Sequence, residues 1–409
     1  MTVSDEIRDE TRDGTGGFRD RARAWLAGNV PAGPFPPDQV LRVAKEFQAA
    51  LFDAGFAGIT WPKEVGGQGL GPAHQQVFSE EAAELDLPTY PLTIGMGMCG
   101  PTLVDLGTPE QKRRYLPKLL RGEEVWCQLF SEPGAGSDLA ALGTRAVRDG
   151  DDWIVTGQKV WTSGAHESQW AILVTRTDPD VPKHQGMTYF LCDMTAPGVE
   201  VRPLRQITGE AEFNEVFLTD VRIPDSMRLG DVGDGWTVAQ TTLMNERVSI
   251  GGGPLPREGG MISVLAKAWR DRPDLRTAGL QDALLKHWVA AEAARLAGER
   301  LRQSLAAGQP GPEGSAQKLT FARLNQEMTS LELELNPEGA LRYEEWTMRR
   351  PTGVDFVGRS PGFRYLRAKG NSIEGGTSEI LRNIVAERVL GLPTEKRVDV
   401  DVPWKDLAK

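Results

Sequence analysis

The sequence predicts a mainly α-helical protein with a central β domain. Apolar residues recur at helical spacing over the first third of the chain, short β-favouring runs replace them from about residue 143, and helical spacing returns beyond Gly235. Several short strands without intervening helices indicate a compact β domain. We therefore expect a helical domain over 1–125, a β domain over 126–232 and a second helical domain over 233–409.

Four amphipathic stretches predict that the first domain is helical. Apolar positions recur every three to four residues over 18–26, 38–47, 75–85 and 109–120, between Pro and Gly breaks. The stretch AGITWPKEVGGQGLGP, residues 57–72, carries several glycines and two prolines and is expected to form an ordered loop between helices.

The middle domain is expected to contain strands at residues 153–156, 171–175, 187–191 and 216–218, which are rich in β-branched and aromatic residues. The turn-forming strings DGDD, DPDVPKHQG and TAPG separate these runs.

The last domain returns to helical spacing. Leu280, Leu284, Trp288 and Ala291 fall on one helical face, and the helical pattern persists through Val389. No internal repeat is visible along the chain.

The composition is that of a soluble globular protein: 409 residues with a formal net charge of -10, 40% hydrophobic and 25% charged residues. The acidic balance argues against a nucleic-acid partner, because neutralising phosphates requires clustered Lys and Arg, and no such patch dominates. The N-terminus is charged where a secretory signal needs an apolar run, and no later stretch is long and apolar enough to span a bilayer. We expect a cytoplasmic protein without a membrane span.

Metal chemistry is not expected. Cys99, Cys127 and Cys192 are widely spaced and form no CxxC pattern, so neither a disulfide framework nor a zinc site is supported. The four histidines form no HExxH pair.

Three strings could carry chemistry. The first, QLFSEPGAGSD over 128–138, has two glycines that let backbone N–H groups approach a ligand and hydroxyls that offer hydrogen bonds. The second, GQKVWTSGA over 157–165, places Trp161 beside hydroxyl donors. Taken alone, this second string predicts a buried Trp in a β core.

The third string, IEGGTSEILRN over 373–383, has a glycine pair that opens a helix. Thr377 or Ser378 can cap this helix, and its N-terminus favours an anion. An ordinary capped helix would show the same pattern.

Together, in this order and spacing, the three strings resemble the acyl-CoA dehydrogenase family, and WPKEVGGQGL and NIVAERVLGLP strengthen the match. The resemblance covers nearly the whole chain. It implies an N-terminal helical domain, a β-barrel-like middle domain and a C-terminal four-helix bundle, with FAD between the last two. It also implies oxidation of an acyl-CoA thioester to the trans-2-enoyl-CoA.

The resemblance further implies roles for individual residues. The expected cofactor-binding residues are Gln128, Phe130, Ser131, Gly136, Ser137, Trp161, Thr162, Ser163, Thr377 and Glu379. Trp161 and Ser163 would lie at the N5 edge of the flavin. Ser137 and Arg247 would contact the substrate.

Dehydrogenation also needs a base that removes the α-proton while the β-hydride passes to flavin N5. In one branch of the family this glutamate directly precedes the Gly-Thr of the third string, where this chain has Gly375, with Glu374 one place earlier. In another branch the base lies on the first helix after the β domain, and Glu246 fits that position. Three glycines follow that helix, which suggests close approach to a ligand or backbone. We expect Glu246 to be the base, with Glu374 as the alternative.

Two segments depart from the family pattern. Many members bind the FAD of a neighbouring subunit through an Arg-x-x-Phe-Gly motif and a Leu-Gly-Gly-x-Gly motif. In this chain the corresponding regions read AKAWRDRPDLRTAGLQ and LELELNPEGALRY. The adenine end of FAD would then be held differently or by a partner. The chain looks more like actinobacterial members that act on fatty, branched or sterol-side-chain thioesters.

Three hypotheses follow from the resemblance. The first is a complete dehydrogenase, a homodimer or homotetramer that passes electrons to an electron-transferring flavoprotein. The second is a non-catalytic or half-site subunit of a hetero-oligomer. The third is an oxygen-reactive relative, such as an acyl-CoA oxidase or a nitroalkane oxidase.

Overall fold

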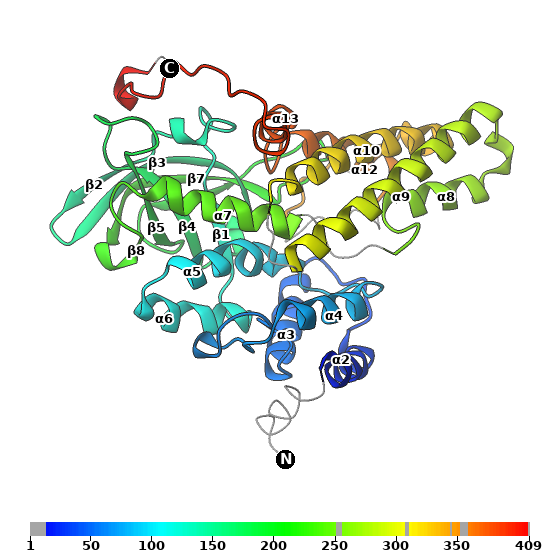
Figure 1. Ribbon diagram of the computed structural model, residues 1–409, viewed down its shortest axis with the longest axis horizontal. Coiled ribbons are helices and arrows are strands. Elements are labelled where there is room, and N and C mark those ends of the chain that lie inside the picture. Colours follow the sequence, from blue (N-terminus) through cyan, green and yellow to red (C-terminus); the bar gives the residue numbers. More distant parts are fainter. Residues whose placement is uncertain (1–13, 251–255, 307–310, 344–345, 352–358, 408–409) are drawn as a thin grey trace.

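The computed structural model describes residues 14–250, 256–306, 311–343, 346–351 and 359–407. Figure 1 shows a β-sheet region on the left, a group of N-terminal helices below it and a second group of helices on the right. The succession of helices, sheet and helices confirms the predicted fold class.

The N-terminal region is helical: α2 (Thr15–Asn29), α3 (Val40–Asp53), α4 (Pro72–Ala82), α5 (Gly100–Leu106) and α6 (Pro109–Leu120). Helices α2, α3, α4 and α6 confirm the four amphipathic stretches. The expected loop at 57–72 is ordered by its backbone: Gly67 lies so close to Trp61 that a Cβ would sit 2.3 Å from the Trp61 carbonyl oxygen.

A capping box begins α6 and ties it to the sheet region. Thr108 Oγ1 accepts a hydrogen bond from Gln111 N at 3.2 Å, and Gln111 Oε1 accepts one from Thr108 N at 3.0 Å. The Gln111 amide nitrogen then donates to the carbonyl oxygens of Ser226 and Arg228. One buried side chain thus orients the helix relative to the strands.

The strands of the described region form one sheet: β1 (Trp126–Leu129), β2 (Arg145–Asp149), β3 (Asp152–Ser163), β4 (Trp170–Arg176), β5 (Met187–Asp193), β6 (Val199–Pro203), β7 (Phe213–Pro224) and β8 (Arg228–Leu229). The order is β6-β7-β3-β2-β4-β5-β8, with β1 parallel to β4. The four predicted strands lie within β3, β4, β5 and β7.

Both faces of β4 are buried, which explains its continuous apolar run. Ile172 and Val174 pack into a core shared with α5, α6 and α7, whereas Ala171 and Leu173 pack among the strands. This two-sided burial places α7 (Gly235–Ile250) across one face of the sheet (Figure 1).

The C-terminal region contains α8 (Met261–Asp271), α9 (Ala278–Ala306), α10 (Gly314–Leu335), α11 (Pro337–Ala340), α12 (Pro361–Ala368) and α13 (Ser378–Ile384). Helix α10 packs against α8, α9, α12 and α13. The predicted face of α9 is confirmed, because its members Leu280, Leu284, Trp288 and Ala291 all belong to this helical core.

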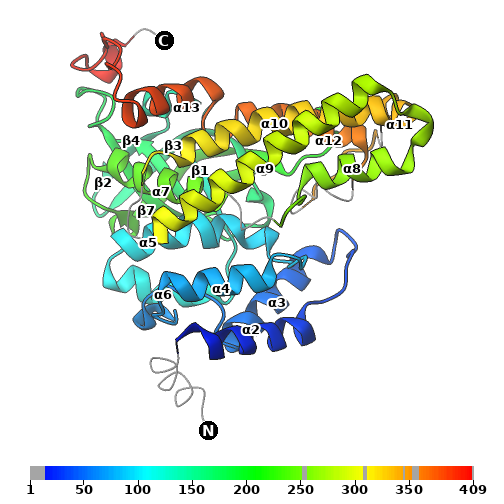
Figure 2. The ribbon, with the colours of Figure 1, turned by 45° about the vertical axis from the view of Figure 1, so that its right-hand side comes forward.

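After α13 the chain leaves the helices and returns to the sheet (Figures 1 and 2). Residues 403–405 pack there against the turn between β4 and β5. None of the described helices combines the length and apolar character needed to cross a membrane.

Candidate functional site

The first two strings lie together along the second half of β3. Val160 N donates to the Ser131 carbonyl oxygen at 2.9 Å. The Lys159 ammonium, fully buried, donates to the Phe130 carbonyl oxygen at 3.0 Å and to Glu132 Oε1 at 2.8 Å. The loop after β1 is therefore anchored to β3 directly beside Trp161.

The Glu132 carboxylate closes the base of this loop. It accepts hydrogen bonds from Gly143 N at 2.7 Å and Thr144 N at 3.0 Å, besides its ion pair with Lys159. Burial opposes ionisation of Glu132, but the Lys159 charge and these hydrogen bonds hold its pKa below the ordinary value. Burial lowers the pKa of Lys159, although Glu132 opposes that effect. We conclude that the pair is ionised and fixes both ends of the 132–143 loop.

Trp161 is exposed, which corrects the interpretation of the second string as a buried core Trp. Its side chain is 56% exposed and its backbone has φ of 61°, a conformation rare for a bulky residue. The irregular β3–β7 register between Lys159 and Thr162 accounts for this outward turn. The ring makes an edge-on contact with Phe213, with the centroids 5.7 Å apart.

The other residues of these two strings differ in exposure. Gln128 and Ser163 are half-buried, Gly136 and Ser137 are exposed, and Thr162 is buried. The side chain of Phe130 is also buried and packs edge-on against Tyr189, so Phe130 can offer a ligand little besides its backbone.

The backbone conformation at residues 375 and 376 in the third string favours glycine. Gly375 and Gly376 have φ of 60° and 92°, which residues with a Cβ rarely adopt. Thr377 Oγ1 then caps α13 by accepting from Ile380 N at 3.2 Å, which confirms the predicted cap. Because α13 has seven residues, its N-terminus alone does not define an anion site. Glu379 is exposed and forms an ion pair with Arg382 at 3.1 Å.

Glu374 is held in an ion pair on the protein. Its carboxylate accepts from Arg367 at 2.8 Å and 3.0 Å, and from the Asn371 amide at 2.7 Å. The Arg367 guanidinium also lies 5.8 Å from the centroid of Phe213, which in turn contacts Trp161. Phe213 therefore links the second string to the third.

Sequence reasoning missed both Phe213 and Arg367. Neither residue belongs to one of the three strings, and their partners are distant along the chain. A single aromatic residue such as Phe213 in the sequence does not indicate a ligand site. Its contacts with Trp161 and Arg367 are visible only in the folded chain.

Lys318 on α10 holds the glycine turn. Its ammonium group donates to the carbonyl oxygens of Asn371 and Gly376, both at 2.8 Å. Burial lowers the pKa of Lys318, and the negative charges of Glu374 and Glu246 oppose that effect. Both candidate bases are thus within electrostatic reach of one buried cation.

Glu246 lies near the end of α7 and is half-buried. The side chain of Arg247 and the glycines at 251–253 lie outside the described residues.

The surroundings of Trp161 fit a planar, partly polar cofactor. The exposed indole offers an aromatic face, and a Cβ built on Gly134 or Gly136 would meet nothing within 4 Å, so the loop backbone is open to a ligand. Within the described part of the chain, the buried atoms Thr162 Oγ1 and His166 Nε2 have no hydrogen-bond partner. In the same part, no group of three or more His, Cys, Asp or Glu could hold a metal ion.

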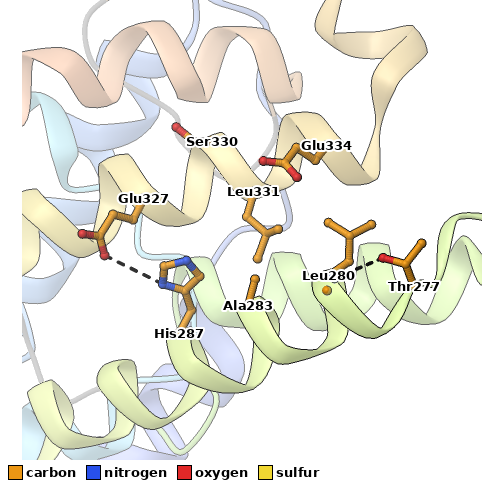
Figure 3. A pocket seen from close by; sticks show the side chains of 9 residues that line it. Thr277, Leu280, Ala283, His287, Glu327, Ser330, Leu331 and Glu334 are labelled. Atoms are coloured by element: carbon orange, nitrogen blue, oxygen red, sulfur yellow. Dashed lines mark hydrogen bonds and ion pairs between the residues drawn. The ribbon is translucent and has the colours of Figure 1, made fainter.

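A separate groove lies between α9 and α10 (Figure 3). It has a volume of about 530 Å³, and a His287–Glu327 contact of 3.9 Å lies within it. None of the predicted site residues lines this groove, so it plays no part in the site around Trp161.

Comparison with protein families agrees with the fold. Three family profiles match the chain: acyl-CoA dehydrogenase, N-terminal domain, over 15–123; middle domain, over 127–221; and C-terminal domain, over 233–390. The chain belongs to the acyl-CoA dehydrogenase family, whose members are FAD-dependent oxidoreductases that act on acyl-CoA. This confirms the expected family, enzyme class and cofactor.

Two similar proteins of known family come from Mycobacterium tuberculosis. Acyl-CoA dehydrogenase FadE34 of Mycobacterium tuberculosis is 44% identical over 85% of this chain, which spans about half (46%) of that relative's length. Acyl-CoA dehydrogenase IpdE1 of the same organism is 38% identical over 93% of this chain and 98% of its own length. Among solved structures, the steroid acyl-CoA dehydrogenase Tcur3481-Tcur3483 aligns with a TM-score of 0.75 at 30% identity, covering 93% of this chain and 98% of that chain.

Proposed function

We propose that this chain catalyses α,β-dehydrogenation of an acyl-CoA thioester, with Glu246 as the base that removes the α-proton. The observation that carries this proposal is that Lys318, which donates to the Gly376 carbonyl oxygen at 2.8 Å, lies within electrostatic range of Glu246. Glu374 is the alternative candidate, and its carboxylate accepts hydrogen bonds from Arg367 and Asn371.

The chain's own residues would then bind and orient the reactants. Trp161 packs against the cofactor, Ser131 and Ser163 offer hydrogen bonds, and Thr377 approaches from the C-terminal helices. Ser137 on the exposed part of the loop contacts the thioester. FAD, when bound, supplies the acceptor for the hydride that leaves the β-carbon.

An absorption spectrum of the purified chain from about 300 to 600 nm tests this function, taken before and after anaerobic addition of acyl-CoA thioesters. We expect a bound-flavin band that bleaches on addition of a substrate. A flavin band that no thioester bleaches would contradict the proposed reaction, and hydrogen peroxide formed during turnover would identify an oxygen-reactive relative instead.

The identity of the acyl group is a further proposal. Similarity to a steroid acyl-CoA dehydrogenase favours a sterol-derived thioester over an unbranched fatty acyl-CoA. A panel of straight-chain, branched and sterol-side-chain thioesters would decide this, since the ratio of kcat/KM values measures discrimination. Preference for a straight-chain thioester would overturn the substrate proposal and leave the reaction intact.

A half-site subunit is the second candidate function. The departures at AKAWRDRPDLRTAGLQ and LELELNPEGALRY favour it, because they replace motifs expected at the adenine end of FAD. A chain that emerges colourless alone and gains flavin with a partner subunit would support a hetero-oligomer. Yellow protein with activity would support a homodimer or homotetramer, with an electron-transferring flavoprotein as the proposed acceptor.

A further inference from the structure

The C-terminal segment reaches the far side of the loop that carries Ser137. Figures 1 and 2 show the segment leaving α13 and crossing to the sheet. Trp404 N donates to the Val181 carbonyl oxygen at 2.9 Å, and Lys405 N donates to the Pro179 carbonyl oxygen at 3.0 Å. An ion pair of 2.7 Å between Lys405 and Asp180 adds to this attachment.

The indole of Trp404 contacts the end of the loop. Its Nε1 donates to the Ala141 carbonyl oxygen at 3.1 Å. The Arg176 guanidinium lies 5.0 Å from the Trp404 ring and donates to the Ala140 carbonyl oxygen at 2.5 Å. Two adjacent loop carbonyls are thus satisfied by Arg176 and Trp404.

Lys183 makes a second connection between the segment and the loop. Its ammonium group lies 2.6 Å from an oxygen of Asp138 and 2.6 Å from an oxygen of Asp399. The Lys183 side chain is 8% exposed, whereas the side chains of Asp138 and Asp399 are 55% and 27% exposed, so solvent screens the contact with Asp399 less than the contact with Asp138. Hydrogen bonds from Lys183 and Arg397 lower the pKa of Asp399 well below its usual value.

The loop therefore has two kinds of support. Glu132 and Lys159 hold its base entirely within the sheet region. Its outer part, from Asp138 to Ala141, is held by Lys183, Arg176 and Trp404. Of the groups in this arrangement, Asp399, which pairs with Lys183, and Trp404 come from the C-terminal segment. Asp138 directly follows Ser137, so a shift of Asp138 moves the residue proposed to contact the thioester.

We propose that residues 397–405 form a C-terminal clasp that sets the position of the Ser131–Ala141 loop for the acyl-CoA thioester, with Asp399 and Trp404 as positioning residues. This inference rests on the proposed function of the loop. Because binding linkage is reciprocal, a bound thioester that orders the loop also strengthens the attachment of the clasp.

Two conservative variants test the clasp in the full-length protein. Asp399→Asn removes the charge that faces Lys183, and Trp404→Phe removes the Nε1 donor while keeping an aromatic ring over Arg176. Asp401→Asn is the matched control, because Asp401 lies two residues away with an exposed side chain. Asp399→Asn and Trp404→Phe are each expected to raise KM for the acyl-CoA about three- to tenfold and to keep kcat within about twofold, because each loses one polar contact.

Hydrogen exchange of the loop's backbone amides measures the order of the loop independently of catalysis. We expect amides over 134–143 to exchange about threefold faster in Asp399→Asn and Trp404→Phe than in Asp401→Asn, with or without flavin. Unchanged loop exchange and unchanged KM in both variants would overturn the clasp. If the wild-type chain oxidises no thioester, the proposed function fails, whereas faster loop exchange in the variants still supports the clasp.

Discussion

Tyr189 and Thr242 bring their hydroxyl oxygens within 2.9 Å of each other, and both side chains are fully buried. Thr242 Oγ1 also lies 3.0 Å from Thr102 Oγ1 on α5. Three hydroxyls thereby join the N-terminal helices, the sheet and α7. Because Glu246 follows Thr242 by one helical turn, this junction also orients the helix that carries the proposed base.

Replacing Thr242 with Val keeps the shape of the side chain and removes the shared hydroxyl. We expect the free energy of unfolding to fall by about 1–3 kcal/mol, because Tyr189 and Thr102 lose a buried partner. Urea unfolding measures this loss. Thr241→Val on the same helix is the control and is expected to change stability by less than about 0.5 kcal/mol; equal effects of both variants would contradict the role of the junction.

Glu246→Gln and Glu374→Gln separate the two candidate bases. We expect Glu246→Gln to slow flavin reduction by acyl-CoA about 10²- to 10⁴-fold, since a general base contributes that much. Glu374→Gln keeps a hydrogen-bonding group beside Arg367 and is expected to retain the rate within about tenfold. Stopped-flow absorbance under anaerobic conditions measures both rates. Full activity of the Glu246→Gln protein would exclude Glu246 as the base.

Trp161→Ala distinguishes a ligand-facing aromatic from a core residue. Because the side chain is 56% exposed, we expect the unfolding free energy of the flavin-free protein to change by only about 1 kcal/mol. Loss of aromatic packing is expected to raise the flavin dissociation constant about tenfold. Trp153→Ala is the contrasting variant: Trp153 is 5% exposed, and its removal is expected to cost about 3–5 kcal/mol. Flavin titration and thermal unfolding provide the two readouts, and unaltered flavin affinity in Trp161→Ala would refute the assignment.

The buried Lys159–Glu132 pair is expected to behave as a unit. Lys159→Met leaves Glu132 without its cation, and Glu132→Gln leaves Lys159 without its anion, so each single variant should lose about 3–5 kcal/mol of stability. The double variant is expected to lose less than the sum of the two. A double-mutant cycle by denaturant unfolding measures the coupling. Additive losses would show that the pair does not hold the loop base cooperatively.

His166 predicts a pH dependence of stability. Burial, assisted by the Arg350 charge, lowers its pKa from 6.5 to about 4, although a hydrogen bond with Asn214 opposes the shift. Between these values the unfolded chain binds a proton that the folded chain does not, so stability falls as the pH falls from about 6.5 to 4.

The size of this effect should be about 1–2 kcal/mol, because solvent partly screens the half-buried ring. It is measured as the difference between wild-type and His166→Gln unfolding free energies at several pH values, which removes the contribution of other groups. Parallel pH curves for the two proteins would contradict the shift.

The sequence by itself determined the succession of helices, strands and helices. Helical and strand periodicities are local properties, so α6 and β4 could be predicted from short windows. The strings around Ser131, Trp161 and Thr377 also determined the family, because their order and spacing survive in the linear chain.

Only the tertiary structure decided how these strings meet. The exposure of Trp161 depends on an irregular β3–β7 register, and the contact of Phe213 with Arg367 joins residues 154 positions apart. The packing of α10 against α7 and α13 likewise lets Lys318 donate to the Gly376 carbonyl oxygen and brings it within electrostatic range of Glu246. Such convergence depends on long-range packing of whole elements, which no local pattern encodes.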